Sequence, residues 1–217
     1  MGDIFREVDE ELKQERYEKL WRQYRWCIIG AAIVMVAAVA GWQVWNAYQI
    51  SQRHAEGQKF AAATALLREG KPTAAADIFS GLARDASSGY GILAQFYQAN
   101  ISAKAGNAMQ AIDLYDRIAR DSSAPKSMQG LATVLATLQA LKVPSITAET
   151  IRQNIQPMSG AGKPYRLIAL EILALTAQRE QDLDTARANY RAIIDDPAAA
   201  TGIRTRAAQM LNILGAS

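Results

Sequence analysis

A nearly uncharged apolar stretch, Cys27 to Trp45, constrains the structure of this 217-residue chain more than any other feature. It contains no Lys, Arg, Asp or Glu, and its only strongly polar side chain is Gln43. A helix over these 19 residues would be about 28 Å long, enough to cross the hydrocarbon core of a bilayer. The sequence therefore predicts one transmembrane helix over residues 26–48.

Aromatic residues flank the apolar stretch on both sides. All four tryptophans of the chain lie near its two ends: Trp21, Trp26, Trp42 and Trp45. Large amphipathic rings favour the interface between lipid and water. We therefore expect these four residues to be membrane-interface anchors.

A cleaved signal peptide is the alternative interpretation of this segment, because Ala38-Val39-Ala40 before Gly41 resembles a cleavage site. The 26 residues before the stretch contain seven acidic and six basic residues, whereas a signal peptide begins with a short basic segment. The apolar character also continues past that site to Trp45. Both observations favour an uncleaved anchor.

The flanking charges predict the orientation of the helix. Three basic residues lie within two turns of its N-terminal side: Lys19, Arg22 and Arg25. The basic residues on the other side lie farther away: Arg53 and Lys59. Because the more basic flank stays in the cytoplasm, we expect residues 1–25 to form a cytoplasmic helical segment. In a bacterial inner membrane, residues 49–217 would then form a periplasmic domain.

Composition excludes several kinds of site in that domain. The formal net charge of +3 is too small and too dispersed for a nucleic-acid interface. Cys27 is the only cysteine, so the domain can form neither a disulfide nor a thiolate metal site. The absence of thiols suits an oxidising compartment.

A faint repeat follows the apolar stretch. Residues 69–85, 105–121 and 180–196 each contain a small residue, an aromatic residue four positions later and an aliphatic residue three after that. The triplets are Ala75-Phe79-Leu82, Ala111-Tyr115-Ile118 and Ala186-Tyr190-Ile193. A degenerate copy in third place has Ala148, Arg152 and Ile155. Another alanine stands twelve residues before each small residue: Ala63, Ala99, Ala136 and Ala174.

This spacing predicts helical hairpins. Small residues let two antiparallel helices approach closely, and the aromatic one turn later fills the space beside them. All six prolines fall between the expected helices, where they cost least. We therefore predict an all-α chain: a transmembrane helix, an α-solenoid of about four hairpins and a C-terminal capping helix over 203–214. An irregular alanine-rich bundle is the alternative.

The spacing and the triplets resemble the tetratricopeptide repeat, a helix–turn–helix unit of about 34 residues. The third unit departs from that pattern at Arg152, and the Trp-Leu-Gly-Tyr run of the first helix is missing.

A second resemblance is strongest over residues 3–50, which contain FREVDEELKQERYEKLWRQYRW at 5–26 and GWQVWNAYQ at 41–49. Together with the repeats they resemble the YfgM-like proteins, bacterial inner-membrane proteins with a periplasmic tetratricopeptide-like domain. The resemblance implies an ancillary subunit of the SecYEG-type Sec translocon. It also implies partners among periplasmic chaperones, including a membrane-anchored prolyl isomerase.

Catalytic chemistry is not expected. The single histidine, His54, has no second histidine with which to complete a metal site. Acidic pairs such as Asp182/Asp184 and Asp195/Asp196 fall at expected helix ends, where aspartate caps helices. The stretch 159–163 lacks the first Gly and the trailing Ser or Thr of a phosphate-binding loop. We expect no enzyme activity, no cofactor and no small-molecule substrate.

The predicted function is therefore protein–protein interaction. The first helix of each hairpin in a solenoid lines a concave face that can hold a peptide. In this register Thr137 lies on that face, and the candidate groove residues are Phe60, Arg68, Phe96, Lys104, Ile172 and Arg179. Two alternatives remain: a regulator acting through the cytoplasmic helix, and a structural scaffold of another envelope complex.

Overall fold

The computed structural model describes residues 3–86 and 89–215, with side chains from Trp21 onward except at 22, 23, 27, 28 and 32. Regular structure in these residues is entirely helical, which confirms the all-α prediction. The elements are α1 (Asp3–Arg68), α2 (Pro72–Asp85), α3 (Gly89–Lys104), α4 (Ala108–Arg120), α5 (Lys126–Ala140), α6 (Ala148–Ile155), the 3-10 helix η1 (Gln156–Met158), α7 (Arg166–Arg179), α8 (Leu183–Ile194) and α9 (Thr201–Ile213).

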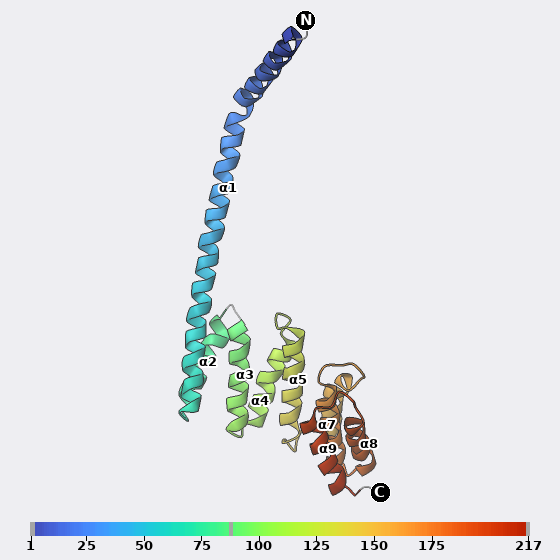
Figure 1. Ribbon diagram of the computed structural model, residues 1–217. Helices are drawn as coiled ribbons and strands as arrows, with labels where there is room; N and C mark the ends of the chain where they lie inside the picture. The colour runs from blue at the N-terminus through green and yellow to red at the C-terminus, as the bar shows by residue number, and fades with distance from the viewer. Residues whose placement is uncertain (1–2, 87–88, 216–217) are drawn as a thin grey trace. The chain divides into compact units, whose positions relative to one another are not determined.

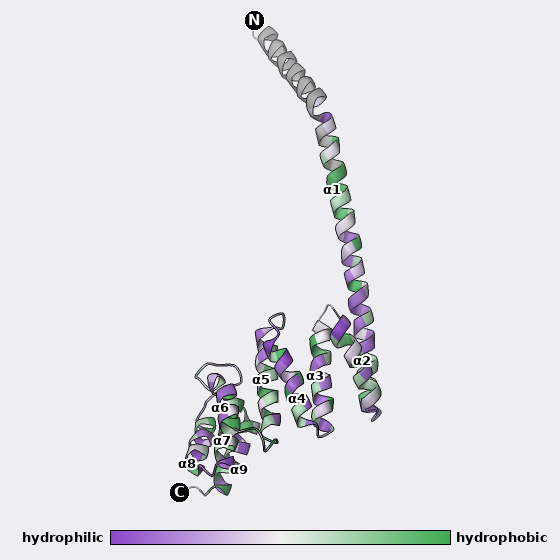
Figure 2. Ribbon diagram, turned by 180° about the vertical axis from the view of Figure 1, so that it is seen from behind, coloured by the Kyte–Doolittle hydropathy of each residue, from purple (hydrophilic) through white to green (hydrophobic). Residues whose placement is uncertain are grey.

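The apolar stretch lies inside α1. By length and composition, α1 is the one helix of the described residues able to cross a membrane, with a mean hydropathy of 2.1 over its most apolar window. Figure 2 shows this apolar section along its middle. The four flanking tryptophans are between 62% and 72% exposed. The membrane bounds 26–48 and the interface role of the tryptophans stay predictions.

The described chain divides into two compact units, one ending at Ala55 and one beginning at Glu56. The second unit consists of four helical hairpins and a final helix (Figure 1). The first hairpin pairs the end of α1 with α2, and the next three pair α3 with α4, α5 with α6, and α7 with α8. The predicted capping helix is α9, which packs on α8.

The core of this unit forms where the repeat pattern places small and aromatic residues. Phe79 and Tyr115 are at most 2% exposed, as is Tyr190 of the fourth hairpin. The alanines expected on the partner helices are buried too, with Ala63, Ala99 and Ala174 at 0% and Ala136 at 5%. Four apolar clusters result, and each joins a hairpin to the helix that follows it or precedes it. The close-packing role of the alanines is therefore confirmed.

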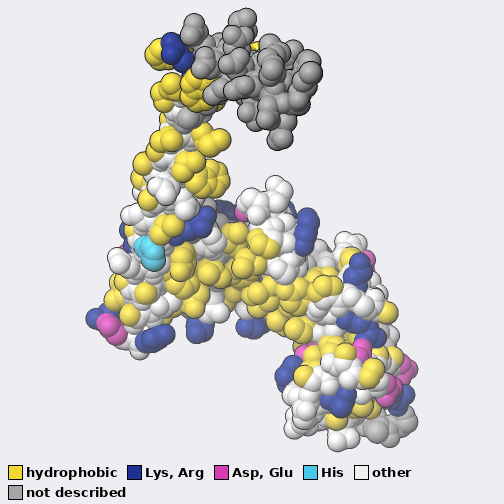
Figure 3. All heavy atoms as spheres, turned by 45° about the horizontal axis from the view of Figure 1, so that its top comes forward, with side chains coloured by type: hydrophobic (Ala, Val, Ile, Leu, Met, Phe, Trp, Pro, Cys, Tyr) yellow, Lys and Arg dark blue, Asp and Glu magenta, His cyan; other side chains and the backbone are white. Residues whose placement is uncertain are grey.

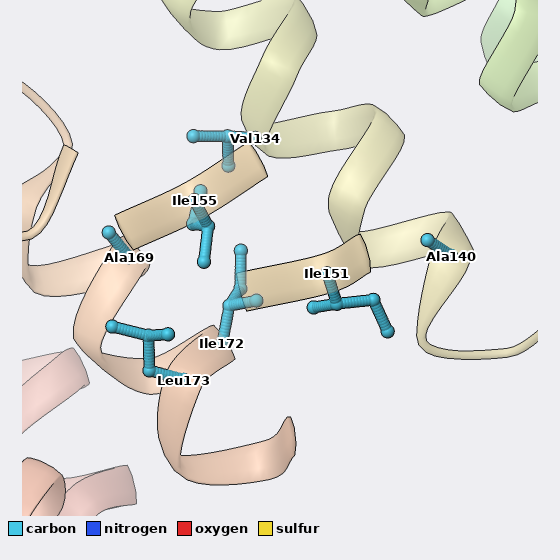
Figure 4. Packing of buried hydrophobic residues seen from close by; sticks show 7 residues of the cluster. All are labelled: Val134, Ala140, Ile151, Ile155, Ala169, Ile172 and Leu173. Carbon is cyan, nitrogen blue, oxygen red and sulfur yellow. The ribbon is translucent and has the colours of Figure 1, made fainter. Parts of the chain in front are cut away.

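The third hairpin keeps Ala148 and Ile155 buried, as its degenerate triplet predicts, but it lacks a buried aromatic residue. Its second helix, α6, has only eight residues, compared with 12 to 14 in α2, α4 and α8. Ile151 is fully buried, whereas Arg152 is half-exposed and forms ion pairs with Glu149 and Glu180. Figure 4 shows Ile151 and Ile155 of α6 pointing toward the cluster that contains Ile172. Arg152 thus stands where the other units have a buried aromatic residue, but its charge stays at the surface and Ile151 fills the interior instead.

The turns agree with the sequence. Gly70 and Gly106 end the first helices of two hairpins with φ values of 74° and 85°, a left-handed conformation that glycine adopts without a steric penalty. No proline of the described residues lies inside an α-helix beyond its first residue, since Pro72 begins α2 and Pro157 lies in η1.

Candidate partner-binding surface

Phe60 belongs to an aromatic cluster in the first hairpin rather than to an open groove. Its ring centroid lies 5.5 Å from that of Phe79, 5.4 Å from that of Tyr90 and 5.2 Å from that of Tyr97. The cluster joins α1, α2 and α3, and Gly57 makes room for it, since a Cβ there would lie 3.1 Å from the Tyr90 hydroxyl oxygen. Phe60 therefore holds helices together and leaves only part of its ring accessible.

The other apolar groove candidates also serve internal packing. Phe96 is half-buried, with its ring 6.0 Å from that of Tyr115. Ile172 is completely buried and Thr137 is 2% exposed. The prediction that these two residues project from the first helices into a groove is wrong. Ile172 belongs to the apolar cluster that joins α7 to the third hairpin, and the Thr137 hydroxyl donates a hydrogen bond to the main-chain oxygen of Thr133.

The three basic candidates end the first helices of the first, second and fourth hairpins. Arg68 and Lys104 are exposed, and no ion pair or hydrogen bond is seen for either among the described residues. Arg179 instead donates hydrogen bonds from Nη2 to the main-chain oxygens of Pro144 and Ile146, at 3.0 Å and 2.6 Å. The structure thus makes Arg179 a clamp on the preceding turn and leaves Arg68 and Lys104 open to solvent.

Three of the four acidic residues singled out in the sequence, Asp182, Asp184 and Asp196, have structural partners. Asp182 caps α8, accepting a hydrogen bond from the main-chain nitrogen of Thr185 at 3.1 Å. Hydrogen bonds from Thr185 lower the pKa of the Asp182 carboxyl. Asp184 pairs with Arg187, and Asp196 pairs with Arg166. These roles are the capping and pairing roles of aspartate at helix ends.

The part of the chain that the structure describes also contains the residues considered for metal and phosphate chemistry. No group of three His, Cys, Asp or Glu residues there could hold a metal ion, and His54 is exposed. Burial raises the pKa of the Tyr115 and Tyr190 phenols, but both rings belong to the core. The stretch 159–163 is a loop with Gly162 in the left-handed region.

Sequence reasoning missed a hollow between the second and third hairpin turns. It has a volume of about 610 Å³ and is lined by the first turn of α4 and by three residues of the next turn: Lys142, Val143 and Pro144. Met109 lies at its edge and is 59% exposed. An apolar residue outside the buried Ala111-Tyr115-Ile118 face of an amphipathic helix is the signal that would have found it.

The comparisons with known proteins concern the repeats. A family model described as "Tetratricopeptide repeat-like domain" matches residues 18–148, more than half of the chain. None of the curated proteins and none of the solved structures compared with the chain matches it. The fold continues the hairpin pattern beyond the matched range, through α8. Repeat domains of this kind are typically non-catalytic modules for protein–protein interaction. The chain belongs to the tetratricopeptide repeat-like domain family.

Proposed function

We propose that the protein is a membrane-anchored interaction module, an ancillary translocon subunit that links Sec translocation to periplasmic chaperones. The observation that carries the anchored module is α1 itself. One helix contains both the apolar stretch and, at its end, the first helix of the repeat unit. A solenoid that follows a membrane anchor in the same chain is tethered to that membrane.

Tethering makes weak contacts sufficient. A partner held at the same membrane is present at a high effective concentration, so individual contacts need little affinity. The exposed surface of the repeats fits this requirement, because the groove candidates that face solvent are isolated basic residues rather than a large apolar patch.

The translocon and chaperone partners rest on the resemblance of residues 3–50 to the YfgM-like proteins. The same resemblance, with the basic flank formed by Lys19, Arg22 and Arg25, supports a cytoplasmic N-terminus and a periplasmic repeat domain. In that arrangement the repeat domain would meet client chains, or the chaperones that receive them, as they leave the pore.

Photo-crosslinking in native membranes tests this proposal. Probes belong at Lys104 and Leu131, which are exposed on first helices, with a control probe at exposed Asn154 on α6. Crosslinks from the first two sites to translocon subunits or a periplasmic chaperone, absent from the control, are the expected result. Crosslinks to another envelope complex would contradict the translocon proposal and favour the alternative of a structural scaffold. A deletion of residues 2–18 tests the alternative of a cytoplasmic regulator. Loss of function in this deletion, together with no crosslink from any of the three probe sites, would establish that alternative.

Orientation has a separate test. In a Cys27→Ser background, a single cysteine replacing Lys104 should react with a membrane-impermeant maleimide in intact spheroplasts. Reaction only after lysis would place the repeat domain in the cytoplasm.

A further inference from the structure

One edge of the repeat unit is formed by the turns within its first three hairpins. We call residues 68–71, 104–110 and 141–147 the turn edge. Figure 1 shows these turns along the lower side of the helices, at the ends of α1, α3 and α5. The turn edge contains four basic residues, Arg68, Lys71, Lys104 and Lys142, and one acidic residue, Glu69.

The charge of the turn edge is largely unneutralised. Glu69 pairs with Lys71 at 2.9 Å. Lys142 contacts only the neutral side-chain oxygen of Gln139, at 3.2 Å, and Arg68 and Lys104 show no acidic partner among the described residues. In the space-filling view of Figure 3, basic side chains are spaced along the lower border of the repeat helices.

The opposite edge of the same three hairpins has no such excess of basic residues. The loops that follow the first three hairpins, residues 85–89, 121–126 and 156–165, contain two acidic residues, Asp85 and Asp121, and two basic residues, Lys126 and Lys163. The charge on the turn edge is therefore a local feature, because the chain as a whole carries a net charge of only +3.

The hollow lies in the middle of this basic edge. Met109 borders it from α4, Val143 and Pro144 supply further apolar surface, and Lys142 borders it as well. Asn107 precedes α4 without a side-chain cap, so the first main-chain N–H groups of that helix add partial positive charge. Methionine adapts its shape to different partners, and it is common at binding surfaces for that reason.

We propose that the turn edge binds an acidic segment of a partner protein, with one apolar side chain of that segment placed against Met109. Charge complementarity selects the acidic segment, and the hollow of about 610 Å³ between the two turns has room for an apolar side chain of that segment beside Met109. The proposal rests on the proposed interaction function and names its contact surface. That surface lies at the ends of the hairpins instead of on the concave face.

Peptide binding to the full-length protein in neutral detergent micelles tests the proposal. Three labelled peptides of equal length serve as probes: acidic with a central Leu, acidic with Ser in its place, and basic with the Leu. The acidic Leu peptide should bind best, with affinity falling as NaCl rises. The K104E/K142E variant should weaken its binding by about tenfold, and M109S by about threefold.

The matched control is K126E/K163E, which reverses two lysines of the opposite edge and should change the affinity less than about twofold. The four lysines of the two double variants are exposed. Circular dichroism should therefore show that both variants fold like the unsubstituted protein. Equal binding of the basic peptide, or equal losses in the control, overturns the proposal. Vesicles rich in phosphatidylglycerol that bind with the same variant dependence, while the peptides do not, would identify a membrane surface as the occupant instead.

Failure here is distinguishable from failure of the proposed function. If translocon crosslinks from Leu131 persist while the acidic peptide does not bind, the module stands and its contact surface lies elsewhere. If the acidic peptide binds but the crosslinks lead to an unrelated complex, the binding role of the turn edge is supported and the translocon proposal is contradicted.

Discussion

The ring of Tyr165 lies against Gly130, so closely that a Cβ atom at residue 130 would come within 2.9 Å of its Cε2 atom. The Tyr165 hydroxyl donates a hydrogen bond to the main-chain oxygen of Ser127 at 2.7 Å, which fixes the ring against α5. The ring and this hydrogen bond hold the long loop before α7 onto the third hairpin.

Replacing Gly130 with alanine should destabilise the protein. Alanine gains about 1 kcal/mol of helix propensity, but the fixed ring cannot move without breaking its hydrogen bond, and overpacking of this kind costs about 1–3 kcal/mol. We expect a net loss of about 1 kcal/mol in the free energy of unfolding, measured by urea denaturation followed by circular dichroism. Gly81→Ala is the matched control, because no atom lies within 4 Å of its added Cβ. Gly81→Ala should stabilise α2, and stabilisation by both substitutions would contradict the proposed role of Tyr165.

Arg179 and Arg68 stand at equivalent helix ends, yet only Arg179 should matter for stability. Arg179→Ala removes two hydrogen bonds to the turn between α5 and α6, and we expect a loss of about 1 kcal/mol. Arg68→Ala should change the stability by less than about 0.5 kcal/mol, because an exposed side chain without a partner contributes little. Thermal unfolding of the two variants in parallel measures this difference. Equal changes in stability would exclude a stabilising role for the hydrogen bonds of Arg179.

The two buried tyrosines of the repeat should respond differently to loss of the hydroxyl group. The Tyr190 hydroxyl accepts a hydrogen bond from the Gln178 side chain at 2.7 Å, whereas no partner of the Tyr115 hydroxyl is seen among the described residues. Tyr190→Phe should therefore cost about 1 kcal/mol and Tyr115→Phe less than about 0.5 kcal/mol. Urea denaturation of both variants measures this difference, and a reversed order would show that the hydroxyl of Tyr115 has a partner in solution.

The Asp182 cap predicts a pH dependence. Hydrogen bonds from Thr185 hold the pKa of the Asp182 carboxyl below its ordinary value. Its stabilising effect is therefore complete above the unfolded-state pKa, near 4, and disappears as the pH falls through the lower folded-state value. Asp182→Ala should lower the melting temperature at neutral pH, and its difference from the unsubstituted protein should shrink in acid.

Asp184→Ala is the control for this cap, since that side chain is 96% exposed. It should have a smaller effect at neutral pH. A difference for Asp182→Ala that stayed constant down to acid pH would show that the carboxylate charge is not involved.

The sequence predicts the repeat architecture well because its strongest signals are also its strongest packing forces. Ala75, Phe79 and Leu82 form a face that only a closely packed partner helix can bury, and that face recurs in the second and fourth hairpins. Proline and glycine positions then limit where the helices end. Helix existence and pairing follow from these local rules.

The candidate surface was harder to predict, because a side chain on a first helix can face either solvent or the next hairpin. Ile172 and Thr137 have the spacing expected of a groove, but both are buried. Conversely, Met109 and Lys142 are 33 residues apart, so their common hollow depends on how two turns approach in space. No local pattern contains that information.

The short α6 has a consequence for how the array unfolds. Each repeat of a solenoid contacts only its neighbours. A repeat of low stability therefore limits how cooperatively the whole unit unfolds. The helix α6 has eight residues, and its buried residues include no aromatic side chain, whereas α2, α4 and α8 each bury one. We expect the amide protons of α6 to exchange with solvent faster than those of α4 or α8, and the opening of this one helix to separate the array into two independently folding halves.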